Sequence, residues 1–242
     1  MGKLFHRLLY RLLSLEGYLR VVSRLFFLNR ALGLGRRGRA LEYNYHLPQL
    51  LGKGDVAIDI GANLGYYTRP MADIVGAGGE VYAVEPVPVI FSVLERNVRG
   101  RRNVHLLNYT LGAEECEVAM ANDSVAQVGY FGTGRNFISE GSLSKDAVRF
   151  TAQMKRGSEL FSALERIDFI KCDIEGYERI VMPEMRALIE RHHPRVLIET
   201  DGDTRSHIIE MFEQMGYRAY MLEEGREVVL DKESDKDIIF RY

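Results

Sequence analysis

The chain has 242 residues, of which 46% are apolar, so it is long enough for one α/β domain with a sizeable core and an appendage. Its net charge of −2 hides an asymmetry, because residues 1–40 carry nine basic side chains against one acid and the remainder is correspondingly acidic. Cys116 and Cys172 are far apart in sequence. This spacing argues against a disulfide framework or a cysteine metal motif, and it favours a reducing cytoplasm.

Residues 3–28 are predicted to form one amphipathic helix, because apolar residues recur at helical spacing with Lys3, Arg7 and Arg11 on the opposing face. Charged residues interrupt the apolar stripe, so the segment is not expected to span a bilayer, and it lacks the cleavage site of a secretory signal. Two interpretations stay open. The helix packs on its own domain or a partner chain, or it lies in the membrane plane with its arginines facing anionic lipid.

Residues 33–39 are rich in glycine and arginine and are predicted to be a flexible basic linker. The chain is therefore divided into an extension, residues 1–40, and a domain, residues 41–242. No aromatic residues alternate with the arginines of the linker, so we expect no nucleic-acid partner.

Residues 56–60 form an apolar, β-branched run that predicts a buried strand, with Asp59 near its end. Gly61 and Gly65 follow in a turn, and a helix is expected to begin near residue 66 or, because Pro70 would interrupt it, somewhat later. The free N–H groups of that helix would face the crevice where α/β folds bind nucleotide-like ligands. The middle glycine of a dinucleotide motif is missing, and Asp59 would repel a pyrophosphate. The pattern therefore favours the cationic cofactor S-adenosylmethionine over NAD.

Residues 80–85 are the second predicted strand, and Glu85 at its end lies about 20 residues beyond the glycine turn, where an acid binds ribose hydroxyls. A helix is expected over residues 89–99 and a third strand over residues 104–109. A turn follows at residues 110–112, where Thr110 would meet an adenine edge. Beyond it, residues 117–121 and 149–154 are predicted strands. Residues 129–146 form either a substrate-facing loop or an ordered hairpin.

A further buried strand, beginning at residue 167, is predicted to end in acids. Asp173 and Glu175 are two residues apart, so an extended chain places them on one side, and Glu178 lies on the following turn. Three carboxylates repel one another unless a cation lies among them. Three cations stay open: the cofactor, a hard divalent ion such as Mg²⁺, and Lys171.

The remaining predicted elements continue the alternation: a helix over residues 185–192, a strand over 195–200, a helix over 204–215, and strands over 217–222, 227–230 and 237–240. The alternation predicts a Rossmann-like, doubly wound, mostly parallel sheet with an antiparallel C-terminal edge. Several predicted strands then end in acids on one rim of this sheet: Asp59, Glu85, Asp173 and Glu199.

These stretches, taken in order, resemble the FkbM-type methyltransferases at residues 58–68, 84–86, 170–178 and 197–199. The resemblance implies a class I fold, S-adenosylmethionine as cofactor, and methyl transfer, usually to a hydroxyl oxygen of a natural product or a glycan sugar. Residues expected to bind the cofactor, from the resemblance and from their place in the turns, are Asp59, Gly61, Asn63, Gly65, Thr68, Glu85 and Thr110. The second family motif contains Asp173, Glu175 and Glu178.

We therefore expect a cytoplasmic S-adenosylmethionine-dependent O-methyltransferase that accelerates an in-line displacement by holding donor and acceptor in position. Asp173 is the first candidate for the general base, followed by Glu175 and Glu199. Two alternatives are an NAD(P)-dependent oxidoreductase and a non-catalytic protein of the same fold that docks at the inner face of a membrane through residues 3–28. The small-molecule or glycan acceptor, a need for Mg²⁺ and the oligomeric state stay open.

Overall fold

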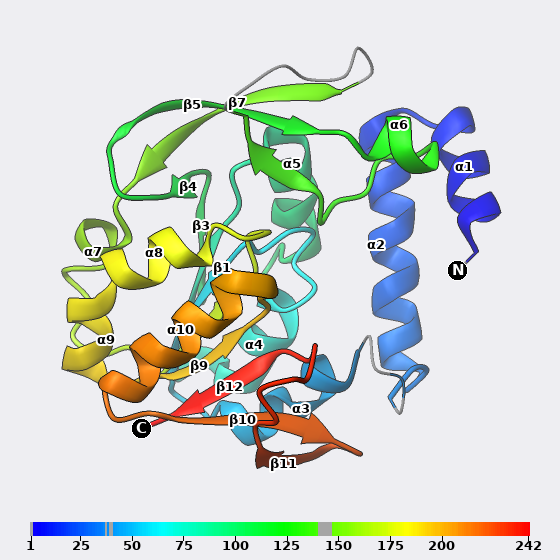
Figure 1. The fold of residues 1–242 in the computed structure, drawn as a ribbon. Helices are drawn as coiled ribbons and strands as arrows, with labels where there is room; N and C mark the ends of the chain where they lie inside the picture. Colours follow the sequence, from blue (N-terminus) through cyan, green and yellow to red (C-terminus); the bar gives the residue numbers. More distant parts are fainter. Residues whose placement is uncertain (1, 37, 39–40, 140–146) are drawn as a thin grey trace.

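A twisted central sheet with helices on both faces forms the body of the protein, and a smaller sheet crosses one end of it (Figure 1). The computed structural model describes residues 2–36, 38, 41–139 and 147–242. In this part of the chain the central sheet has the strands β1 (Val56–Ile60), β2 (Glu80–Val84), β3 (Val104–Leu107), β8 (Phe169–Cys172), β9 (Arg195–Ile198), β10 (Arg218–Glu223), β11 (Arg226–Val229) and β12 (Ile238–Arg241).

The strand order across the central sheet is β11-β10-β12-β9-β8-β1-β2-β3. The five strands from β9 to β3 are mutually parallel, whereas β12 runs antiparallel to both β9 and β10. The predicted Rossmann-like fold with an antiparallel C-terminal part is thus confirmed. However, β12 lies inside the sheet and β11 forms the edge. Ile238, Ile239 and Phe240 of β12 are fully buried, whereas Val229 of β11 is 77% exposed, so burial decides which strand takes the interior position.

Helices cover both faces of the central sheet because its strands are apolar on both sides. In β1, Ala57 packs toward one face and Ile58 and Ile60 toward the other. The first face is covered by α3 (Glu42–Leu50), α4 (Thr68–Val75) and α5 (Pro88–Asn97), and the second by α7 (Gly157–Leu160), α8 (Glu178–Glu184), α9 (Arg186–His192) and α10 (Gly202–Gln214). A short 3₁₀ turn, Gly76–Gly78, leads from α4 to β2.

Helix α4 begins later than the glycine turn alone suggests. Its first residue is Thr68, so Pro70 lies in the first turn. There its missing N–H removes no hydrogen bond, because the N–H groups of the first turn have no partner within the helix. The later start offered in the sequence interpretation is confirmed.

The second sheet consists of β4 (Thr110–Leu111), β7 (Val148–Lys155), β5 (Cys116–Asn122) and β6 (Asn136–Ile138), in that order, and is called the roof below. The strands predicted at residues 117–121 and 149–154 are confirmed. The turn predicted at residues 110–112 is wrong, because Thr110 and Leu111 pair in parallel with Met154 and Lys155 of β7. Within residues 129–146, β6 pairs antiparallel with β5, which lies before this segment, so a hairpin within the segment is not what the described residues show. Residues 140–146 lie outside the described residues. Helix α6 (Ser124–Val128) links β5 to this segment.

Two helices, not one, occupy the region predicted as a single helix over residues 3–28. They are α1 (Lys3–Leu12) and α2 (Leu15–Ala31), and the chain breaks between them where the Ser14 hydroxyl accepts a hydrogen bond from the Gly17 N–H at 3.2 Å. Tyr18 and Leu19 of α2 are buried in one cluster with residues of the glycine turn, α5 and the roof. The packing interpretation is thus confirmed for α2.

The linker predicted at residues 33–39 lies only partly in the structure, because residues 37, 39 and 40 are outside the described residues. Across the described part of the chain, no helix combines the length and apolarity that crossing a bilayer requires.

Candidate functional site

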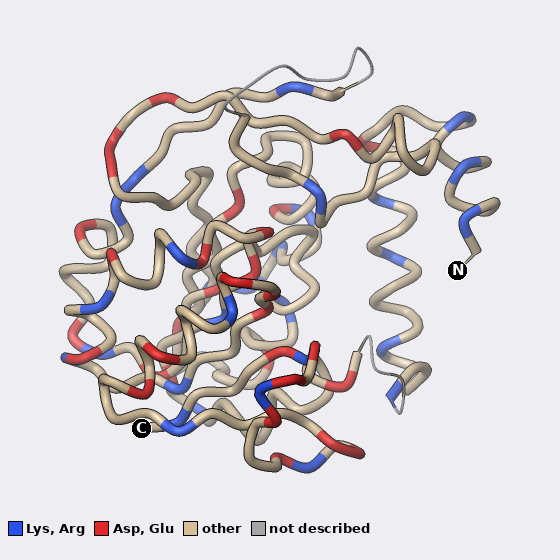
Figure 2. Tube along the Cα trace, viewed as in Figure 1, with Lys and Arg blue, Asp and Glu red and all other residues tan. Residues whose placement is uncertain are grey.

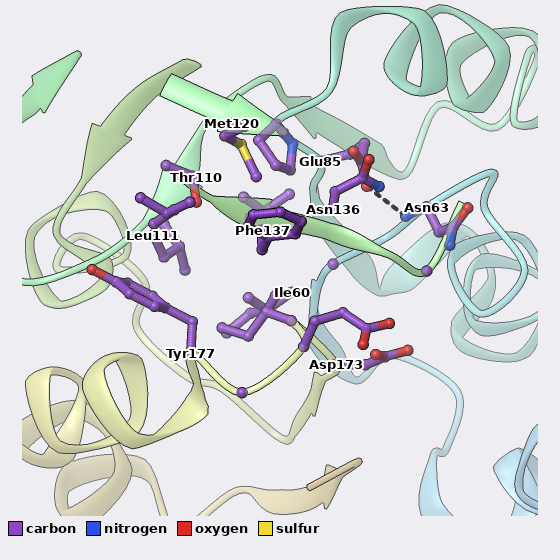
Figure 3. A pocket seen from close by; sticks show the side chains of 18 of the residues that line it. Ile60, Asn63, Glu85, Thr110, Leu111, Met120, Asn136, Phe137, Asp173 and Tyr177 are labelled. Atoms are coloured by element: carbon purple, nitrogen blue, oxygen red, sulfur yellow. Dashed lines mark hydrogen bonds between the residues drawn. The ribbon is translucent and has the colours of Figure 1, made fainter. Parts of the chain in front are cut away.

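A pocket opens where the carboxyl ends of β1, β2 and β8 meet the roof (Figure 3). The central sheet contributes strand ends and the turns after them, and the roof contributes apolar and amide side chains from β4, β5 and β6. Predicted site residues that line the pocket are Gly61, Asn63, Glu85, Thr110, Asp173 and Glu175. Predicted site residues outside the lining are Asp59, Gly65, Thr68 and Glu199.

The glycines of the β1 turn are required by contacts within the protein. Gly61 has a φ of +77°, and a Cβ atom there would lie 2.0 Å from the carbonyl oxygen of Asp173. Only glycine therefore lets the turns after β1 and β8 touch. Gly65 has a φ of +83°, and its Cβ would lie 2.9 Å from Leu94 in α5. Gly65 thus packs the turn against α5, whereas Gly61 shapes the pocket.

Glu85 holds the β1 and β2 turns together at the pocket wall. Its carboxylate accepts hydrogen bonds from the Asn63 N–H and the Val87 N–H, each at 2.9 Å. Only 4% of the residue is exposed. Burial raises the pKa of Glu85 to about 7, although the two backbone donors favour its ionised form. Each carboxylate oxygen keeps a further lone pair for a ligand hydroxyl.

A buried lysine supplies the positive charge among the acids of the pocket. The Lys171 Nζ atom lies 2.9 Å from Oδ2 of Asp173 and 5.0 Å from the centre of the Tyr67 ring. Burial lowers the pKa of Lys171, but the carboxylates of Asp173 and Asp59 outweigh that effect and raise it above its ordinary value. Lys171 is therefore a cation that fixes the direction of the Asp173 carboxylate.

Asp59 and Thr68 lie beneath the pocket rather than in its wall. Both are fully buried, and the Thr68 hydroxyl donates to Oδ2 of Asp59 at 2.6 Å. Burial raises the pKa of Asp59, while the charge of Lys171 opposes this shift. The geometry favours an indirect role for this pair, through Lys171, over the direct cofactor contact expected from the sequence.

The other acids of the second motif have different surroundings. Glu175 has a φ of +56° and reaches the loop before β6, where a Cβ atom on Gly134 would lie 3.1 Å from Glu175 Oε1. Partial burial, and then the charge of Asp173, raise the pKa of Glu175 to about 7. Glu178 is 1% exposed and accepts a hydrogen bond from the Ile174 N–H at 2.8 Å. This bond holds the turn between β8 and α8 in place. Glu178 does not line the pocket.

Glu199 ends β9 on the same rim but stands outside the pocket lining. More than a third of its surface is exposed, yet desolvation and the charges of Asp173 and Asp237 raise its pKa to about 8. Among the described residues, no group of three or more His, Cys, Asp or Glu side chains is arranged to hold a metal ion. The cation found beside Asp173 is Lys171.

Sequence reasoning missed the residues that the roof brings to the pocket. They include Met120, Asn136, Phe137 and Ile138. Two pocket residues that follow β8 were also missed: Tyr177 and Arg179. No local motif marks the roof residues, because the roof forms by pairing strands that are distant in sequence. Tyr177 stands inside the family stretch 170–178, so its position next to the acids was the one available signal.

The sequence profile of the methyltransferase FkbM domain matches residues 59–219, well over half of the chain. The chain belongs to the FkbM methyltransferase family. The match spans the glycine turn, Glu85, the roof and the second acidic motif, so the residues that build the pocket all lie within the FkbM domain.

Solved structures and one curated protein extend this comparison. Methyltransferase FkbM from Methylobacillus flagellatus KT has a similar fold, with a TM-score of 0.51, 13% identity, and coverage of 80% of this chain and 45% of that chain. Aeropyrum pernix fibrillarin, solved with natively bound S-adenosyl-L-methionine, has a TM-score of 0.46, 17% identity, and coverage of 79% and 67%. Protein-L-isoaspartate O-methyltransferase from Methanothrix thermoacetophila is 38% identical over 69 residues, 27% of this chain. The match spans a third of that relative's length.

Proposed function

We propose that this FkbM family member transfers the methyl group of S-adenosylmethionine to a hydroxyl oxygen of a sugar, glycan or natural-product acceptor. The observation that carries the proposal is that Glu85, Asp173 and Glu175 all line one pocket at the carboxyl ends of parallel strands. A positively charged nucleoside suits such a wall, because ionised carboxylates attract its charge and accept its hydroxyl hydrogen bonds.

The residues of the pocket fit that cofactor part by part. Glu85 would accept hydrogen bonds from the ribose hydroxyls through its remaining lone pairs, and Asp173 would face the cationic end. The apolar side chains of Leu111, Met120 and Phe137 would enclose the adenine ring. When bound, the cofactor supplies an electrophilic methyl group on a sulfonium centre. The same carboxylates disfavour the alternative NAD(P) cofactor, because they would repel its pyrophosphate.

Acidic side chains of the pocket would then orient the acceptor and accept the proton of its hydroxyl group. Asp173 is engaged by Lys171 at 2.9 Å, which leaves it suited to holding the cofactor. Glu175 reaches the loop before β6 and has a pKa raised to about 7, near the value that suits a general base. We therefore assign to Glu175 the role first given to Asp173: it would accept the proton of the acceptor hydroxyl during methyl transfer. Most of the acceleration comes from holding donor and acceptor in line, about 7–11 kcal/mol in favourable cases.

Radiolabelled methyl transfer tests the proposal. Purified protein is incubated with methyl-labelled S-adenosylmethionine and a cell extract, and the products are then treated with alkali. Label in alkali-stable ethers is expected, since methyl esters are hydrolysed. The rate should rise with pH through about 7, because Glu175 accepts a proton only when ionised. Label confined to alkali-labile esters or to nitrogen would contradict hydroxyl methylation.

The variant Glu175→Gln is expected to lower the turnover number about 100-fold and to remove this pH dependence, because the amide cannot accept the proton. Glu114→Gln is the matched control, since Glu114 is exposed and outside the pocket. Equal pH profiles for wild type and Glu175→Gln would exclude the assigned role of Glu175.

A further inference from the structure

Helix α1 presents an apolar face to solvent. Leu4, Leu8 and Leu12 follow one another at four-residue spacing and are 79%, 55% and 70% exposed, and Phe5 beside them is 40% exposed. No residue of α1 is buried. The rest of the helix holds it to the protein, since His6 bonds the Tyr18 hydroxyl at 2.8 Å and stacks on Tyr130. The leucine face is therefore exposed on a helix that is fixed on its other side.

Positive charge borders the leucine face. Lys3, Arg7 and Arg11 also follow at four-residue spacing, and α1 contains no acid. Arg7 donates to the Val128 carbonyl oxygen at 2.8 Å, whereas Lys3 and Arg11 have no carboxylate partner among the described residues. In cross-section, α1 thus has an exposed leucine face with a basic face directly next to it. This is the pattern of an amphipathic helix that lies in a lipid interface.

The groove between α2 and α5 is a second basic feature of the N-terminal region. Its lining consists of Arg20, Arg24, Arg96, Asn97 and Arg99. Arg96 pairs with Glu16 at 3.5 Å, and the other arginines of the groove have no carboxylate partner in the described part of the chain. Lys and Arg recur along both α1 and α2 (Figure 2). Each basic residue near an anionic membrane contributes about 1 kcal/mol of attraction.

We propose that α1 docks this protein on an anionic lipid surface, with its leucine face in the interface and its basic edge at the headgroups. The charge selects this occupant. A second copy seated symmetrically on the same face would bring two positively charged helices together, which is unfavourable, whereas an anionic surface complements them. The leucine face supplies the apolar area that turns electrostatic attraction into insertion.

Helix α1 also contacts the segment of the chain that leads into the pocket wall. Arg7 contacts α6 through Val128, and a Cβ atom on Gly129 would lie 3.2 Å from the Arg7 side chain. The segment that follows carries the roof residues of the pocket from Thr133 to Ile138. Figure 1 shows α1 and α6 side by side at one end of the roof. The proposal itself does not depend on methyl transfer, because its test measures no activity.

Vesicle flotation with the full chain tests the proposal. The probes are vesicles of phosphatidylcholine mixed with phosphatidylglycerol and vesicles of phosphatidylcholine alone. Wild type should float with the anionic vesicles, bind the neutral ones weakly, and be released by high salt. The triple variant Leu4→Asn, Leu8→Asn and Leu12→Asn should lower partitioning of the protein onto anionic vesicles about 100-fold. The double variant Lys3→Gln with Arg11→Gln, which removes two charges of the basic edge, should lower partitioning about 30-fold.

Val229→Asn is the matched control, because Val229 is 77% exposed on β11, far along the chain from α1. It should float as wild type does. All substituted residues are exposed, so the variants should keep the wild-type Tm. Flotation of the leucine variant at the wild-type level would overturn the proposal. Failure of the wild-type protein to bind anionic vesicles would also overturn it. A wild-type dimer that does not bind vesicles and that the leucine substitutions dissociate would point instead to a second copy on this face.

Discussion

Lys171 is the cation on which Asp173 and Asp59 depend most directly. It is 4% exposed, pairs with Asp173 and lies within electrostatic reach of Asp59. From the sequence, Lys171 was one of three cations that could reconcile the carboxylates. The structure places it there because β8 is buried on both faces, and a lysine in such a strand stays charged only with carboxylate partners.

The variant Lys171→Met should therefore lower the free energy of unfolding by about 3–5 kcal/mol, because it leaves Asp59 and Asp173 without their buried cation. Urea denaturation measures the change. Lys155→Met is the control, since the Lys155–Glu115 pair lies at the surface, and its removal should leave stability nearly unchanged. Similar losses in the two variants would refute the role given to Lys171.

At the scale of elements, the pocket depends on contact between the turns after β1 and β8. The variant Gly61→Ala should lower stability and weaken cofactor binding, because its Cβ would lie 2.0 Å from the Asp173 carbonyl oxygen. Gly76→Ala is the control, with a φ of +67° and no atom within 4 Å of its Cβ. Backbone strain alone is about 1–3 kcal/mol, so Gly61→Ala should cost clearly more than that. Equal losses, measured by urea denaturation, would show that the turn contact contributes nothing.

The elements that could be predicted from the sequence are those with local patterns. The strand before Gly61 and the strand before Glu85 are apolar runs that end in turn residues, and both were expected within a residue of their observed ends. The roof could not be predicted as a unit. Its strand β5 is exposed in its first part and buried at its end, and it pairs with β7 through residues far apart in sequence, such as Cys116 and Met154. No local pattern in the sequence marks that pairing. The break at Ser14 was missed because the apolar stripe continues across it, although serine is a common helix cap.

At the scale of the whole molecule, the charge asymmetry seen in the sequence becomes a spatial one. Asp and Glu are spread over the central body, whereas the basic residues of the N-terminal region lie along α1 and α2 (Figure 2). Three of the acids line the pocket at the rim of the central sheet: Glu85, Asp173 and Glu175. The sequence division at residue 40 separates these charges, but α2 packs into the core with Leu64 and Val87. The pocket and the proposed docking face therefore belong to one folded body.

Calorimetric titration with S-adenosylhomocysteine tests most directly the claim that the acids of this pocket grip a nucleoside cofactor. We expect one site per chain, with an affinity that falls as the pH drops below about 7. The pKa of Glu85 is raised to that value, and protonation removes acceptor lone pairs from its carboxylate. Glu85→Gln should weaken binding about 10–100-fold, and Glu114→Gln should bind as wild type does. A folded wild type that takes up NADH but not S-adenosylhomocysteine would contradict that claim.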